Sequence, residues 1–336
     1  MNQIEFIQYM QNKARQKHSL FQLEIDVTSK CNAKCPFCFQ GDHSMETDDS
    51  ISYSKMIELL DDLRKMGVYY IGFSGGEPFL RKDFIKILEA AKERGFRVSI
   101  ITNGMALNKE LIDRMHEIKL EHITVSFHSI SREIYEKSFG LNGGTGYEKA
   151  IENIRHMLDV GLNVGIAITV TRYNIETIPQ TKDYFVKMGI DPRDINYNML
   201  LRGKQEINSL YPEEENIAAV KNIISVKAKG KEYRKGLLCS AGSISCTIDY
   251  KGNVYPCSFF NASAGNINDQ SIEQIWNESH LFKIIRGLRE DMFKECNKCS
   301  IMGKCSFCMA NNLNQTGNLF EPDKEFCGSR KAKEAI

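Results

Sequence analysis

The sequence predicts an α/β protein whose larger part is a partial (β/α)6 TIM-like barrel and whose C-terminal part is a smaller, cysteine-rich domain. Two observations indicate this. From residue 21 to about residue 229, short β-rich runs alternate with longer amphipathic ones, which is the pattern of a parallel sheet covered by helices. Beyond that point the alternation ends and the cysteines become dense. The 336 residues are enough for one large and one small domain.

The expected barrel consists of six βα units. We expect strands at residues 23–27, 69–73, 97–101, 122–127, 164–170 and 195–200. We expect amphipathic helices near residues 53–66, 83–94, 108–118, 147–160, 175–188 and 213–228. Because a full TIM barrel needs eight units, this sheet should remain open, with its chemistry at the C-terminal ends of the strands.

A hairpin and two short helices are expected in the C-terminal part. Residues 243–249 and 254–259 flank a Tyr-Lys-Gly-Asn turn, and helices should follow at residues 271–279 and 280–289. The expected domains are an N-terminal helical segment at residues 1–20, the barrel at 21–230, the cysteine-rich domain at 231–330 and a tail at 331–336.

The composition of the chain limits the kinds of macromolecule and membrane that the protein is expected to bind. The chain has 44 Lys and Arg against 43 Asp and Glu, a formal net charge of +1, so its bulk charge does not favour nucleic acid or an anionic membrane. No apolar run has the length of a membrane span, and residues 1–17 are polar and unlike a signal peptide. We therefore expect a cytoplasmic protein with neither a nucleic-acid nor a membrane partner.

The eleven cysteines fall into three groups, at residues 31–38, 239–257 and 296–327. A disulfide framework would suit a small secreted domain, so this clustering favours metal. Cys31, Cys35 and Cys38 form a CxxxCxxC motif. A 4Fe–4S cluster is usually held by four thiolates, so three leave one iron open to a methionine-type amino acid. A structural zinc knuckle is the alternative, although zinc sites favour CxxC pairs and four closed ligands.

This motif resembles that of radical S-adenosylmethionine (SAM) enzymes, in which the position of Phe37 packs near the adenine of SAM. Ser74 is followed by Gly75, Gly76, Glu77 and Pro78, which resembles the GGEP turn that holds the methionyl ammonium in this family. Paired glycines let a backbone approach a ligand closely, and the proline fixes the exit of the turn. The resemblance therefore implies SAM contacts by Phe37 and by Gly75, Gly76 and Glu77.

Further SAM contacts follow from the resemblance. Asn103 belongs to a Thr-Asn-Gly sequence that is common in the family, and Ser126 lies where a family serine contacts the SAM ribose. His128 replaces a usual Asp, and it is either a proton-transfer residue or a hydrogen-bonded strand-end residue. Ser138 occupies the place of the Arg that pairs with the SAM carboxylate in many relatives. Either Lys137 supplies the charge instead or the contact is made elsewhere.

The C-terminal cysteines resemble those of the SPASM extension, which binds two auxiliary 4Fe–4S clusters. By the interleaved pattern of that family, the first auxiliary cluster would be held by Cys239, Cys246, Cys257 and Cys308. The second would be held by Cys296, Cys299, Cys305 and Cys327. With three cysteines for the SAM cluster, this partition uses all eleven and implies three clusters plus SAM. Two zinc knuckles are the alternative for this region.

The resemblance implies that the protein reductively cleaves SAM to a 5′-deoxyadenosyl radical, which abstracts hydrogen from a substrate. Auxiliary clusters favour a net oxidation, and a cross-link in a ribosomally made peptide is the leading case. Only 30 residues precede Cys31, fewer than the N-terminal recognition domain of many peptide cyclases. We expect a peptide substrate. Because the stretch before Cys31 is short, the leader of that peptide would be bound by a separate protein or by the barrel. The expected electron donor is of the flavodoxin or ferredoxin type.

Several alternatives stay open. Sulfatase maturases, which form formylglycine, use an Asp next to the third cysteine of the first auxiliary set, whereas Ser258 follows Cys257 here, so this activity is less favoured. A small-molecule or tetrapyrrole substrate remains an alternative. The non-enzymatic alternatives are an iron–sulfur electron carrier or a zinc-binding module, neither of which would need the GGEP turn or the strand-four serine.

Overall fold

The structure is a computed structural model, and it describes residues 2–39, 51–200, 205–224, 239–300, 308–324 and 327. The chain divides into two compact units. The first unit comprises Met1–Lys30, Ser44–Ile100 and Leu238–Met292. The second comprises Cys31–His43, Ile101–Leu237 and Phe293–Ile336. The domain boundary expected near residue 230 lies outside the described residues and stays a prediction.

The strands of the first unit run in the order β3-β2-β1-β7-β8-β9. Their bounds are β1 (Gln22–Asp26), β2 (Tyr70–Ser74), β3 (Arg97–Thr102, the last two residues in the second unit), β7 (Ser245–Ile248), β8 (Asn253–Tyr255) and β9 (Gly265–Asn266). The β1, β2, β3 and β7 pairings are parallel, and those of β7 with β8 and of β8 with β9 are antiparallel. The expected hairpin is therefore confirmed. It also joins the edge of the barrel sheet, because β7 pairs with β1.

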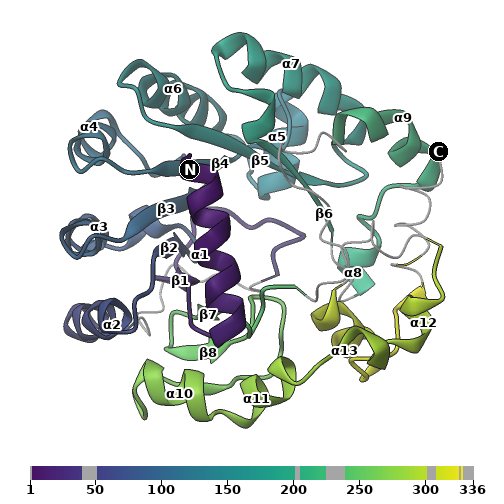
Figure 1. Ribbon diagram of the computed structural model, residues 1–336. Coiled ribbons are helices and arrows are strands. Elements are labelled where there is room, and N and C mark those ends of the chain that lie inside the picture. The colour runs from purple at the N-terminus through teal and green to yellow at the C-terminus, as the bar shows by residue number, and fades with distance from the viewer. Residues whose placement is uncertain are drawn as a thin grey trace. The chain divides into compact units, whose positions relative to one another are not determined.

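The two faces of this sheet differ in polarity, because side chains alternate along each strand. One face carries Ile25, Ile71 and Phe73, which are fully buried. Helices α2 (Tyr53–Lys65) and α3 (Phe84–Glu93) lie on one side of these strands (Figure 1). The opposite face carries small and polar side chains, with Glu24 paired in register with Gly72 and Gly72 with Ser99. This polar face is the inner face of the partial barrel.

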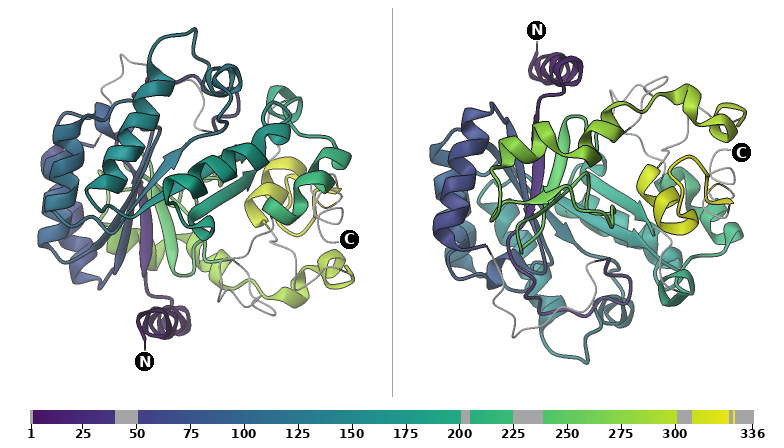
Figure 2. Two further views of the ribbon diagram at one scale, coloured as in Figure 1. Left: turned by 90° about the horizontal axis from the view of Figure 1, so that it is seen from above. Right: turned by 90° about the horizontal axis from the view of Figure 1, so that it is seen from below.

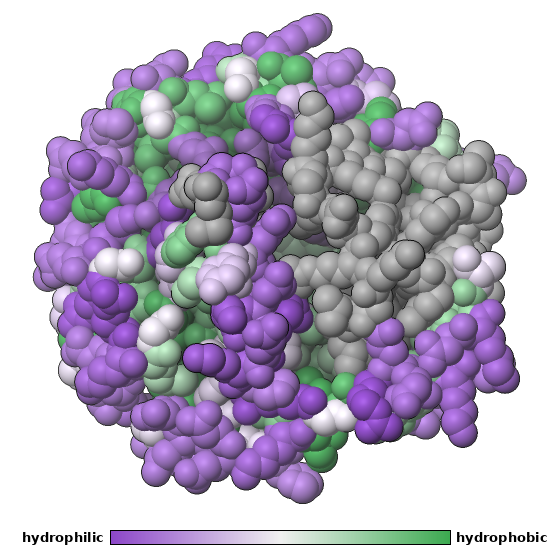
Figure 3. Space-filling model, viewed as in Figure 1, coloured by the Kyte–Doolittle hydropathy of each residue, from purple (hydrophilic) through white to green (hydrophobic). Residues whose placement is uncertain are grey.

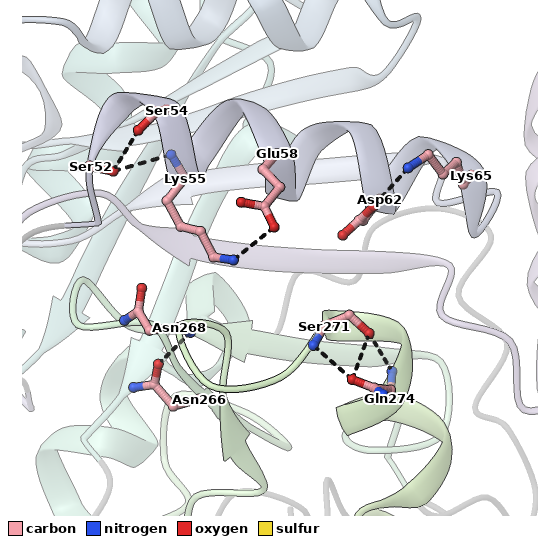
Figure 4. Close-up of polar contacts among 10 residues, drawn as sticks. All are labelled: Ser52, Ser54, Lys55, Glu58, Asp62, Lys65, Asn266, Asn268, Ser271 and Gln274. Atoms are coloured by element: carbon pink, nitrogen blue, oxygen red, sulfur yellow. Dashed lines mark hydrogen bonds and ion pairs between the residues drawn. The ribbon is translucent and has the colours of Figure 1, made fainter.

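Two helices of the first unit begin at well-formed N-caps (Figure 4). In α2 the Ser52 hydroxyl accepts a hydrogen bond from the Lys55 backbone N–H at 3.2 Å. Helix α10 (Ile272–Glu278) begins with a capping box formed by Ser271 and Gln274. The helix packs beside α2, and α11 (His280–Arg286) follows it directly. Side-chain caps of this kind satisfy backbone donors that a helix leaves unpaired at its start.

Helix α1 (Gln3–Lys17) precedes β1 and lies beyond the start of that strand in both views of Figure 2. Its capping box consists of Asn2 and Glu5. The Trp276 indole N–H donates to the His18 carbonyl at 2.8 Å, which ties the C-terminal end of α1 to α10. The N-terminal helical segment expected from the sequence is therefore present.

The second unit contains three parallel strands in the order β6-β5-β4. They are β4 (His122–Ser126), β5 (Val164–Val170) and β6 (Ile195–Met199). Its α-helices are α4 (Lys109–Glu117), α5 (Arg132–Phe139), α6 (Gly146–Asp159), α7 (Ile178–Met188), α8 (Gln205–Asn208), α9 (Glu214–Ile224), α12 (Lys294–Asn297) and α13 (Met309–Thr316). Its short 3-10 helices lie at Ile175–Thr177 and Pro192–Asp194, and those of the first unit lie at Pro78–Leu80 and Glu290–Met292. All six expected barrel strands are therefore present.

The coloured part of the surface in Figure 3 is mostly hydrophilic, with smaller hydrophobic areas between. Large apolar side chains that are more than a third exposed include Phe6, Tyr9 and Met10 of α1. Across the described part of the chain, no helix combines the length and the apolar character needed to cross a membrane.

Candidate active site

The glycine turn after β2 is bonded to the segment that follows β1. The Gly76 N–H donates to the Thr28 carbonyl at 2.8 Å, and the Glu77 N–H donates to the Lys30 carbonyl at 2.7 Å. Gly75 adopts a φ of +133°, which side-chain-bearing residues rarely adopt. The turn therefore holds the last residues before Cys31 through backbone contacts.

The space around both glycines excludes a side chain. A Cβ on Gly75 would lie 2.5 Å from the Thr28 carbonyl oxygen. A Cβ on Gly76 would lie 2.2 Å from the Lys30 oxygen and 2.6 Å from the Ser29 oxygen. Both glycines therefore leave room for the chain's own backbone, and the SAM contacts expected for Phe37, Gly75, Gly76 and Glu77 stay predictions.

Glu77 and the short helix after it complete the turn. The Glu77 side chain is fully buried, and its carboxylate accepts a hydrogen bond from the Phe79 N–H at 3.3 Å. Arg81 donates to the Val27 carbonyl at 2.8 Å and pairs with Asp83 at 2.7 Å. Both ends of the glycine turn are thus attached to the C-terminal end of β1.

The second unit contains the CxxxCxxC loop. Cys31, Cys35 and Cys38 are half-buried thiols outside any disulfide. Burial raises the pKa of Cys35, and the charges of Cys38 and Cys31 raise it further. Thiolates that repel one another ionise together only beside a compensating cation. The donor set therefore fits an iron–sulfur cluster held by three thiolates.

Asn103 supports the start of this loop. Its amide nitrogen donates to the Asn32 side-chain oxygen at 2.7 Å and lies 3.9 Å from the Cys31 sulfur. Its own oxygen accepts from the Met105 N–H at 2.9 Å, which fixes the orientation of the amide. Asn103 therefore contacts the cysteine loop directly, and the SAM contact expected for it stays a prediction.

A contact that sequence reasoning missed supports the middle of the loop. The Lys34 N–H donates to the Phe139 carbonyl at 2.8 Å. A Cβ on Gly140 would lie 2.2 Å from the Lys34 oxygen, and Gly140 has a φ of +61°. The available signal was a glycine after the last apolar residue of a helix, which is typical of a C-terminal cap. No sequence signal connects that cap with Lys34.

His128 lies between two aromatic rings. It is 3% exposed, with the Phe37 ring edge-on at 5.0 Å and the Phe139 ring stacked at 4.7 Å between centroids. Its Nδ1 accepts a hydrogen bond from the Thr169 N–H at 3.1 Å. Burial lowers the pKa of His128 to about 3, so the ring is neutral near pH 7. Its contact with Phe37 connects it to the cysteine loop.

Residues 25–185 match the radical SAM superfamily. Residues 239–300 match the SPASM iron–sulfur cluster-binding domain. The chain belongs to the radical SAM superfamily and carries a SPASM domain. This membership confirms the predicted fold class and shows that the protein is an enzyme of the radical SAM kind, with 4Fe–4S chemistry and SAM as its cofactors.

Individual proteins agree with this assignment. The AdoMet-dependent heme synthase of Methanosarcina barkeri is 24% identical and covers 92% of this chain and 96% of its own length. The mycofactocin maturase MftC of Mycolicibacterium smegmatis is 25% identical, with 90% of this chain and 81% of its own length covered. The structure of Streptococcus suis SuiB bound to the precursor peptide SuiA has a TM-score of 0.71 at 19% identity, covering 94% of this chain and 79% of SuiB. The likeness to SuiB shows a shared fold.

In this radical SAM enzyme, Lys137 and Ser138 occupy the place where the sequence predicts a contact with the SAM carboxylate. The Lys137 ammonium lies 3.9 Å from the centroid of the Tyr173 ring, a cation–π contact. The Ser138 hydroxyl is buried and has no hydrogen-bond partner in the described ranges. Ser126 ends β4 on the face that also carries Thr124, and it is half-buried. The SAM contacts of Lys137 and Ser126 stay predictions.

The SPASM cysteines occupy different environments. Cys246 is buried on β7, Cys239 is exposed, and the other described members are half-buried: Cys257, Cys296, Cys299, Cys308 and Cys327. The Cys308 sulfur accepts a hydrogen bond from the Asn311 N–H at 3.4 Å, at the start of α13. Cys305 lies outside the described residues. Within those residues, no three His, Cys, Asp or Glu side chains are grouped closely enough for a single metal ion.

Proposed function

We propose that this radical SAM enzyme oxidises the side chain of a peptide, with a cross-link in a ribosomally made peptide as the leading case. The observation that carries the proposal is the similarity to MftC over 90% of the chain, because the name of that protein identifies it as a maturase. The SPASM match lies C-terminal to the radical-generating motif and contains further cysteines that can hold auxiliary clusters. Auxiliary clusters suit the removal of an electron from a substrate.

The residues around the cysteine loop have separate tasks in this proposal. Cys31, Cys35 and Cys38 hold the cluster that, when SAM is bound and an electron is supplied, provides a 5′-deoxyadenosyl radical. The Gly75–Gly76 turn fixes the entry to the loop through Thr28 and Lys30. These backbone contacts fix the residues that lead into the loop.

Within the second unit, side chains support the loop. Asn103 directs an amide N–H toward the Cys31 sulfur, and hydrogen bonds of this kind tune an iron–sulfur site. His128 supports Phe37. His128 is also our candidate for taking the second proton from the substrate. Because Nδ1 accepts from the Thr169 N–H, the neutral ring carries its hydrogen on Nε2, so the substrate proton would go to Nδ1 once that hydrogen bond is broken.

We propose three clusters in total. Cys239, Cys246, Cys257 and Cys308 would hold the first auxiliary cluster. Cys296, Cys299, Cys305 and Cys327 would hold the second. In the net reaction, one substrate hydrogen would pass as an atom to the 5′-deoxyadenosyl radical, which becomes 5′-deoxyadenosine. A second hydrogen would leave as a proton while its electron passes to an auxiliary cluster and the new bond forms.

The proposed partners are the peptide substrate, a separate leader-recognition protein and a flavodoxin- or ferredoxin-type electron donor. The cytoplasmic location expected from the sequence stays a prediction. A formylglycine-forming activity remains less favoured, because Ser258 stands where the maturase base would be. The family membership argues against the two non-enzymatic alternatives.

A tetrapyrrole substrate is the second candidate, and the similarity to the heme synthase over 92% of the chain favours it. The two candidates separate in one experiment. The anaerobically reconstituted enzyme is incubated with SAM and dithionite, either with the small peptides encoded beside its gene or with a panel of iron porphyrins. The proposal predicts a peptide that loses about 2 Da for each bond formed, since two hydrogens leave and nothing is added. Conversion of a porphyrin with no change in any peptide would replace the first candidate by the second.

A further inference from the structure

Arg286, the last residue of α11, has a guanidinium that is only partly paired. Its Nε donates to the Gly242 carbonyl at 3.0 Å. Its central carbon lies 4.2 Å from the centroid of the Trp276 ring and 5.4 Å from that of Phe282. Its Nη2 is buried without a hydrogen-bond partner among the residues that the structure describes.

A buried, unpaired donor on a charged group is costly, because it loses its hydrogen bonds to water and gains none in the protein. A guanidinium carries five N–H donors in a fixed planar fork, and here Nε and the ring stacking fix the plane of that fork. The Nη2 cannot turn away to solvent without breaking both contacts. An acceptor bound at this place would remove the cost.

The residues around Arg286 include a predicted cluster ligand. The Gly242 N–H donates to the Ser245 carbonyl at 2.8 Å, so the residue whose carbonyl Arg286 holds is itself bonded to the residue just before Cys246. Cys246 is 3% exposed. Arg286 therefore holds the backbone of the segment that leads into Cys246, and its unpaired Nη2 belongs to the same buried group.

We propose that the Nη2 of Arg286 donates a hydrogen bond to a sulfur of the iron–sulfur cluster that Cys246 ligates and thereby raises the reduction potential of that cluster. The inference rests on the proposed function, because it needs Cys246 to be an auxiliary-cluster ligand. A hydrogen bond and a positive charge both stabilise the added electron of a reduced cluster. A higher potential makes the cluster a better electron acceptor from an oxidised substrate. Arg286 is therefore a positioning residue that acts through the cluster.

The test uses the full chain with Cys31, Cys35 and Cys38 all replaced by Ala, which leaves only the auxiliary clusters. Arg286→Met, Arg286→Gln and Arg286→Lys are compared in this background by iron analysis and by redox titration monitored by EPR. Arg289→Met is the matched control, since Arg289 is 67% exposed and pairs only at the surface with Asp291.

We expect Arg286→Met and Arg286→Gln to lower the midpoint potential of one auxiliary cluster and to leave the other unchanged. Arg286→Lys, which keeps the charge, should restore part of the shift, and Arg289→Met should cause none. If Arg286→Met does not fold, the comparison of Arg286→Gln with Arg286→Lys decides. Unchanged potentials, or equal shifts of both clusters, would overturn the inference alone. A background protein that takes up zinc and no iron would instead overturn the proposed function.

Discussion

The imidazole of His128 meets the ring of Phe37 edge-on, with the ring centroids 5.0 Å apart and the ring planes at 85°. Phe37 lies between two cysteines of the CxxxCxxC loop in the sequence. A residue predicted as a proton acceptor therefore also supports the loop, and these two roles lead to different experiments.

The first experiment measures stability against pH. The pKa of His128 is lowered to about 3 in the folded protein, against about 6.5 in an unfolded chain. The unfolded state therefore binds the proton more readily, so stability falls as the pH drops below about 6.5. From pH 7 to pH 5.5, wild type should lose about 1 kcal/mol more than His128→Gln in urea unfolding. Equal losses in the two proteins would show that His128 is not held neutral in the folded state.

The second experiment separates proton transfer from support. His128→Phe keeps an aromatic ring between Phe37 and Phe139 but removes the proton acceptor. If His128 takes the substrate proton, the variant should still form 5′-deoxyadenosine while oxidised product falls by about 100-fold or more. His128→Ala removes the ring as well and should reduce both products. A His128→Phe enzyme with normal product yield would restrict His128 to the supporting role.

Gly76→Ala tests the contact between the glycine turn and the segment before Cys31. The added Cβ would lie 2.2 Å from the Lys30 carbonyl oxygen, so the backbone must move. We expect a loss of about 2 kcal/mol in stability, with weaker SAM binding and fewer irons bound. Gly67→Ala is the control, because Gly67 also has a positive φ, of +77°, but a Cβ there meets nothing within 4 Å. Wild-type iron content and melting temperature in Gly76→Ala would contradict this account.

Asn103→Asp tests the support of Cys31. The substitution preserves the oxygen that accepts from Met105 but replaces the donor facing Asn32 and the Cys31 sulfur with an acceptor. The new negative charge should lower the iron retained during gel filtration and lower the potential of the SAM cluster. Asn108→Asp is the control, because Asn108 caps α4 and Asp caps a helix equally well. A cluster that is unaffected by Asn103→Asp would show that this contact is incidental.

The sequence predicted the strands well because each is short, contains β-branched residues and is bounded by clear breaks. The strand expected at residues 164–170 is β5 without change. The helix expected at residues 175–188 begins as a 3-10 turn, and its α-helical part starts at Ile178, next to Pro179. Helix α5 was missed because its eight residues give too short a periodic pattern. The six barrel strands and the helices between successive strands were thus readable from local pattern, whereas α5 was not.

The parts of the site that were missed all depend on contacts between distant segments. The motif residues Cys31, Cys35 and Cys38 are readable from spacing alone. The contact of Gly140 with Lys34 and the hydrogen bond from Arg286 to Gly242 join residues far apart in the chain. Local propensity and periodicity carry no information about such pairs, and the pairing of β7 with β1 escaped prediction for the same reason.

The central claim is that the cysteines hold three iron–sulfur clusters, one of which cleaves SAM. Iron, sulfide and zinc analysis of the anaerobically reconstituted protein, together with 5′-deoxyadenosine measurement, tests it most directly. The account predicts about twelve irons per chain. It predicts about eight irons, and no 5′-deoxyadenosine, when Cys31, Cys35 and Cys38 are all replaced by Ala. Stoichiometric zinc with no uptake of iron would contradict it.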